Sequence, residues 1–98
     1  MRVMATTEDL RTLPEAFTDE WASEIARAAL LYLARRYVAG ADLSVLEPWE
    51  GQVNAAATAR DARAYRDAMR GYVRAGLRAF EASRHTPGTY VRRPGGAA

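Results

Sequence analysis

The sequence predicts an all-α protein: a small helical bundle built on an antiparallel helical hairpin, with short N-terminal helical turns and a flexible basic C-terminal tail. Two long segments, 18–39 and 54–84, carry apolar residues at the three- and four-residue spacing of amphipathic helices. A connector containing Gly and Pro separates them, as a hairpin requires. We therefore expect one helical domain over residues 1–86 and an extended or disordered tail over 87–98.

The first elements expected are one or two short N-terminal helical turns. Thr7 and Thr12 are candidate caps, and Pro14 suits the first turn of a helix. Thr18 then precedes the first long helix, whose first turn is acidic and whose last turns hold arginines, as the helix dipole favours. Gly40 stands where a left-handed residue would end this helix.

The connector and the second long helix follow. Asp42 can cap a single helical turn that Pro48 stops, and Asn54 can cap the second helix. This helix contains Gly71 and Gly76, each of which costs about 1 kcal/mol relative to alanine. Either the helix bends there, or Gly76 lets another backbone approach closely.

Composition restricts the size of the core. Alanine accounts for 21 of the 98 residues, whereas Leu, Ile, Val and Phe together number only 17. We expect the isolated chain to be unstable or to associate, as a homo-oligomer or as a subunit of a hetero-complex. An N-terminus without an apolar run, and no apolar stretch of about 20 residues, predict a cytoplasmic protein without a membrane span.

The residue types argue against an enzyme. The chain has no cysteine and no lysine, and its single histidine, His85, lies at an expected helix end where the helix dipole explains it. Glu20 and Glu24 share a helix face without the Glu-x-x-His pairing of di-iron bundles. We therefore expect no catalytic residues, no cofactor and no metal site.

A row of arginines is the most regular feature of the sequence. Its members are spaced by three or four residues, so on a helix they fall within an arc of about 120°. They are Arg60, Arg63, Arg66, Arg70, Arg74 and Arg78. Guanidinium groups one helical turn apart can donate paired hydrogen bonds to phosphates or carboxylates. The alternative is a solvated helix face, since all 14 basic residues of this chain are arginine.

The distribution of charge along the chain also indicates what kind of partner it binds. Residues 1–50 hold five Arg against nine acids, and residues 51–98 hold nine Arg against three acids. Such a split favours a nucleic acid, contacted through its backbone, or an acidic protein surface. A third possibility is an assembly or connector protein in which the acidic half of one copy meets the basic half of the next.

Large aromatic residues are expected where helices pack or where a partner binds, because the thin core leaves them few neighbours. These residues are Trp21, Tyr32, Trp49, Tyr65 and Tyr72.

Two resemblances to known families follow from these features. In size, helicity and a basic face, the chain is similar to the helical small subunits of CRISPR effector ribonucleoproteins, which implies a non-enzymatic subunit that holds nucleic-acid strands by their backbone. The tripeptide "WEG", Trp49 to Gly51, resembles the Trp-x-Gly turn of the WXG100 family, which implies a secreted helical hairpin. The departures from that family are Pro48 directly before the Trp and a first helix that ends near Gly40.

Overall fold

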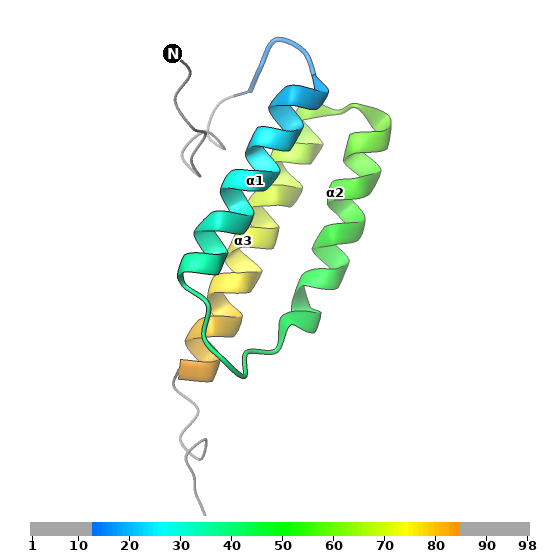
Figure 1. Cartoon of the computed structure of the whole chain (residues 1–98). Coiled ribbons are helices and arrows are strands. Elements are labelled where there is room, and N and C mark those ends of the chain that lie inside the picture. Colours follow the sequence, from blue (N-terminus) through cyan, green and yellow to red (C-terminus); the bar gives the residue numbers. More distant parts are fainter. Residues whose placement is uncertain (1–12, 85–98) are drawn as a thin grey trace, which may run out of the picture.

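The computed structural model describes residues 13–84, which form a bundle of three α-helices and one short 3-10 helix (Figure 1). The elements are α1 (Asp19–Arg35), the 3-10 helix η2 (Leu43–Leu46), α2 (Glu47–Ala59) and α3 (Ala62–Arg84). The prediction of an all-α helical bundle is confirmed. Thr7, Thr12, His85 and the predicted tail 87–98 lie outside the described residues.

Helix α1 begins at the predicted cap. The hydroxyl of Thr18 accepts a hydrogen bond from the backbone N–H of Trp21 at 3.0 Å, which satisfies one of the first N–H groups of the helix. The helix ends at Arg35, earlier than expected, and Gly40 adopts its positive φ of 88° in the following loop. The early end has a packing reason. Val38 would point away from the core on a continued helix, whereas from the loop it packs against the core.

Residues 13–18, which precede α1, are not helical. The expected turn at Pro14 is absent, and residues 13–18 form an extended segment with a bend. Phe17 lies edge-on to the rings of Trp21 and Tyr65, with centroids 5.6 and 5.5 Å away. This aromatic contact holds the segment across the ends of α1 and α3, so tertiary packing overrides the weak local helix signals.

Proline starts the second α-helix instead of stopping the turn before it. Asp42 caps η2 as predicted, because its carboxylate accepts from the N–H of Ser44 at 3.1 Å. Helix α2 then begins at Glu47, and Pro48 lies in its first turn. An N–H group in the first turn has no acceptor within the helix, so a proline at this position costs no helical hydrogen bond. Asn54, the expected cap, lies inside α2.

The segment 54–84, predicted as one helix, is divided by a turn at Arg60 and Asp61. Arg60 adopts the left-handed conformation, and the N–H of Asp61 donates to the carbonyl of Ala56 at 3.0 Å, as in a Schellman motif. The carboxylate of Asp61 then accepts from the N–H of Ala64 at 3.0 Å and caps α3. The antiparallel hairpin is therefore α2–α3, while α1 and α3 run parallel to each other (Figure 1).

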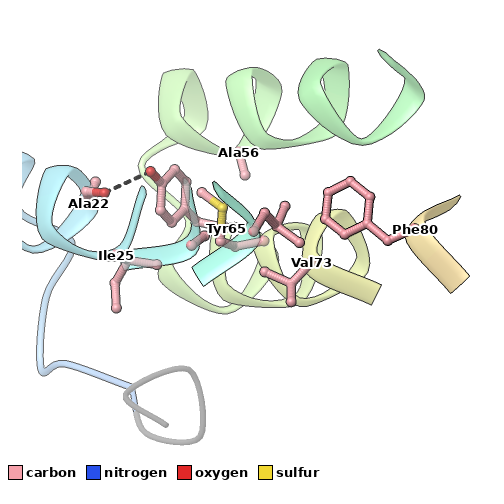
Figure 2. Packing of buried hydrophobic residues seen from close by; sticks show 9 residues of the cluster. Ala22, Ile25, Ala56, Tyr65, Val73 and Phe80 are labelled. Carbon is pink, nitrogen blue, oxygen red and sulfur yellow. Dashed lines mark hydrogen bonds between the residues drawn. The ribbon is translucent and has the colours of Figure 1, made fainter. Parts of the chain in front are cut away.

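The core lies mainly between α1 and α3. Ile25 is its most completely buried large side chain, at 1% exposure. Helix α2 contributes only Ala56 to the buried cluster, and its Val53 and Ala57 pack against that cluster as partly buried residues. The cluster consists of Ala22, Ile25, Ala29, Leu33, Ala56, Tyr65, Met69, Val73 and Phe80 (Figure 2).

Helix α3 is continuous through both of its interior glycines. A Cβ atom at Gly71 would lie 2.2 Å from Cζ3 of Trp49, and one at Gly76 would lie 2.8 Å from Cδ2 of Leu33. Each glycine therefore admits a large side chain from a neighbouring helix. The expectation of a close backbone approach at Gly76 is wrong, because the neighbour there is a side chain.

Tyr65→Phe is expected to lower the free energy of unfolding by about 1 kcal/mol. The hydroxyl of Tyr65 donates to the carbonyl of Ala22 at 2.8 Å inside the core (Figure 2), and phenylalanine loses this hydrogen bond. Burial also raises the pKa of Tyr65 above its usual value near 10. The protonated phenol is thus favoured in the folded state.

Because the folded-state pKa of Tyr65 lies above the unfolded-state pKa, its contribution to stability is present below pH ~10. The contribution is lost as the pH rises through the folded-state pKa. Urea denaturation measured at a series of alkaline pH values should show a steeper loss of stability in the wild type than in Tyr65→Phe. Parallel losses in the two proteins would contradict this role of the buried phenol.

Candidate functional site

Five arginines form one continuous surface along α3, which we call the arginine face: Arg63, Arg66, Arg70, Arg74 and Arg78. They occupy an arc of about 120° of the helix, and the residues that α3 buries occupy the rest of its circumference. Within the arginine face, Arg63, Arg74 and Arg78 are exposed, whereas Arg66 and Arg70 are half-buried. From the first to the last arginine it extends for about 22 Å along the helix axis.

Arg60, predicted as the first member of the row, has another role. It lies in the turn before α3, where its guanidinium donates to the carboxylate of Asp19 at 3.0 Å and to the carbonyl of Phe17 at 3.2 Å. The same guanidinium lies 5.0 Å from the centroid of the Phe17 ring. Arg60 thus connects the α2–α3 turn to the start of α1 and is not part of the arginine face.

The arginines of α3 differ in their partners. Arg66 donates to Asp67 at 2.9 Å and its side chain is only 12% exposed, so this residue is held against the protein. Asp67 thus pairs with its direct neighbour in the sequence and with neither Arg63 nor Arg70, which lie about one turn away. Within residues 13–84, no hydrogen bond or ion pair involves the side chains of Arg63, Arg70, Arg74 or Arg78.

The charge on the two sides of the bundle is unequal. Helix α3 carries six arginines against two acids, Asp67 and Glu81. Helix α2 carries Glu47 and Glu50 and has no basic residue. One face of the bundle is therefore strongly positive and attracts anions over a range of about a Debye length.

A cavity of about 620 Å³ lies beside the end of the arginine face, and we call it the Trp49 pocket. The indole of Trp49 and the small side chains of Ala75, Ala79 and Ala82 line it. Arg78 and Asp42 also line this pocket, so Arg78 belongs to both the pocket and the arginine face. Ala75, Ala79 and Ala82 recur at helical spacing in the sequence, and this pattern is the sequence signal for the pocket.

Asp42 is the acid of this pocket. The N–H and the hydroxyl of Ser44 donate to its carboxylate at 3.1 and 2.6 Å. These two hydrogen bonds lower the pKa of Asp42 below its usual value, the hydroxyl contributing more. The pocket thus contains a carboxylate that is ionised at neutral pH and a guanidinium.

The aromatic residues predicted at interfaces serve the packing of the helices. Tyr65 belongs to the buried cluster, and Trp21, Tyr32 and Tyr72 are half-buried against it. Trp49 covers Gly71 of α3. Each of these residues packs against other residues of the chain. Contact of any of them with a partner remains a prediction.

A second hollow, of about 250 Å³, lies between α1 and α2, with Met69 and Tyr72 of α3 among its lining residues. Leu30 of α1 borders it and is 54% exposed. Burial raises the pKa of Tyr72, and the nearby carboxylate of Glu50 raises it further. This hollow is apolar and lies on the side of α3 opposite the arginine face.

Other kinds of site find little support in residues 13–84. That part of the chain holds no group of three or more acidic or histidine side chains placed to bind a metal ion. None of its helices is both long enough and apolar enough to span a membrane. Trp49 and Gly51 lie inside α2, so the turn that the resemblance to the WXG100 family requires is absent.

The fold and this site define a small three-helix bundle with one strongly basic face. Comparisons with protein-family models, with curated proteins and with solved structures give no significant match for this chain.

Proposed function

We propose that this protein is a non-enzymatic subunit of a larger assembly that binds a nucleic-acid backbone through the arginine face of α3. The observation that supports this most is the set Arg63, Arg70, Arg74 and Arg78, which lie in one row without an acidic partner among residues 13–84. Like charges one turn apart repel each other by a few tenths of a kcal/mol per pair. An anion from another molecule would offset this repulsion.

The dimensions of the row fit a phosphate backbone. Arg70, Arg74 and Arg78 follow one another at intervals of about 6 Å along the helix axis, which is close to the spacing of every second phosphate in a duplex that carries one phosphate per ~3.4 Å of each strand. Each guanidinium can donate two parallel hydrogen bonds to a phosphate. Contacts of this kind fix position and carry no sequence information, so binding is independent of sequence. The role is that of the helical small subunits in CRISPR effector ribonucleoproteins.

The salt dependence of binding tests this function. Four phosphate contacts predict that log affinity falls against log salt with a slope of about −3 to −4. Fluorescence anisotropy with random-sequence DNA and RNA oligonucleotides of about 20 nucleotides should give this slope between ~50 and 200 mM salt. Affinity should change little with sequence. No binding at the lowest salt concentration would exclude the proposed function.

A second candidate function is an assembly protein, and exposed apolar side chains favour it. Leu30 and Tyr37 are more than half exposed, and Leu31, Leu43 and Val45 are exposed by 38–41%. Together with the basic α3 and the acidic α2, these side chains could join one copy to the next, or to an acidic protein. Light scattering that shows concentration-dependent association, together with no nucleic-acid binding, would favour this function.

A further inference from the structure

We infer that the Trp49 pocket holds one unpaired base of a single-stranded nucleic acid whose phosphates lie along the arginine face. The inference rests on the proposed function and specifies its ligand: a single strand in preference to a duplex. Three features of the pocket support this ligand: its position, the chemistry of its walls and its charge.

The position of the pocket follows from Arg78. This residue is the last of the arginine face and also lines the pocket. Arg74 lies one turn before it, about 6 Å along the axis. A strand whose phosphates contact Arg70 and Arg74 would therefore reach the pocket within about one further helical turn, and a sugar at that point would bring a base to the opening.

The walls of the pocket suit a flat, largely apolar group. Trp49 is half-buried, with its indole covering Gly71 and also lining the cavity. The pocket is also lined by Ala75, Ala79 and Ala82, whose side chains end at Cβ and take up little of its volume. Aromatic side chains are the usual platforms for unpaired bases, and stacking on them is tolerant of base identity. The volume of about 620 Å³ lies within the range of small-molecule pockets.

The charges within the pocket favour a neutral base over a second phosphate. Asp42 is ionised and repels anions, whereas its carboxylate can accept a hydrogen bond from the exocyclic amino group of a base. Arg78 can hold the phosphate that precedes the base. In a duplex, the bases are stacked and paired, so none can enter the pocket without unpairing.

Three probes with the same number of phosphates test the inference with the full-length protein: a single strand, an abasic strand with the same backbone, and a duplex with half as many base pairs as the single strand has nucleotides. We expect the single strand to bind about 5- to 100-fold more tightly than the abasic strand. The duplex should bind no more tightly than the abasic strand. Trp49→Ala should abolish the preference for the strand with bases and leave the salt slope unchanged.

A second variant fills the pocket without removing Trp49. Ala82→Leu should also abolish the preference for bases, whereas Ala34→Leu, at an exposed position of α1, should retain it. Equal binding of the single strand and the abasic strand by the wild type would overturn the inference and leave the proposed function standing. Binding of none of the three probes would overturn both.

Discussion

Replacing Arg63, Arg70 and Arg74 together with glutamine is expected to flatten the slope of log affinity against log salt by roughly 2 to 3 units. Each of the three loses one phosphate contact, and each contact contributes ~0.7 to 0.9 to the slope. Between about 50 and 200 mM salt, the wild type should therefore lose roughly 20- to 40-fold more affinity than the variant. Arg78 is kept because it also lines the Trp49 pocket.

The triple variant should still fold. Glutamine is a good helix former, and the three side chains make no hydrogen bond or ion pair within residues 13–84. Arg63 and Arg74 are exposed, and Arg70 is half-buried without a hydrogen bond or ion pair within residues 13–84. Circular dichroism and the melting temperature of the variant should match those of the wild type, because substitutions away from such contacts change stability by about 0.5 kcal/mol or less.

A matched control removes the same charge from another helix. Arg27, Arg35 and Arg36 are exposed and lie on α1 or directly after it, so their replacement with glutamine changes the net charge equally. We expect this control to retain most of the wild-type slope. If both triple variants reduced the slope equally, net charge and not the arginine face would control binding, and the proposed interface would be wrong.

Gly71→Ala is expected to destabilise the protein by about 1 to 3 kcal/mol, although alanine is the better helix former. The added methyl group would overlap the indole of Trp49, whose Cζ3, Cε3 and Cη2 atoms lie 2.2–2.5 Å from its position. Overpacking of this size forces a rigid ring or a helix to move, and its cost exceeds the gain of about 1 kcal/mol in helix propensity. Urea denaturation measures the difference directly.

The other helical glycines provide the controls. Gly51 lies inside α2, and an added Cβ there would have no neighbour within 4 Å, so Gly51→Ala should stabilise the protein by about 0.5 to 1 kcal/mol. The change in stability caused by Gly76→Ala should lie between those of Gly71→Ala and Gly51→Ala. The atoms nearest to its added methyl group are the terminal methyl groups of Leu33, which can rotate away. Stabilisation by Gly71→Ala comparable to that by Gly51→Ala would show that Trp49 does not pack as described.

Local interactions explain what could be predicted from the sequence. The caps at Thr18 and Asp42 are single side chains that bond to backbone groups two or three residues away, so they can be recognised without knowing the fold. The helical period likewise indicated the apolar stripe and placed most of the arginines together on one side of α3. The all-α class follows from these local signals.

The number of helices and their pairing were decided by tertiary packing. No glycine or proline marks the turn at Arg60 and Asp61, and the left-handed Arg60 costs about 1 kcal/mol or more locally. An unbroken helix from Glu47 to Arg84 would leave the apolar side of α2 in water, whereas the turn lets α2 pack antiparallel against α3 and sets α1 parallel to α3. The same turn takes Arg60 out of the arginine row and brings Trp49 over Gly71, beside Arg78. The basic face was therefore determined by local periodicity, and the pocket at its end exists only because packing folded the chain back on itself.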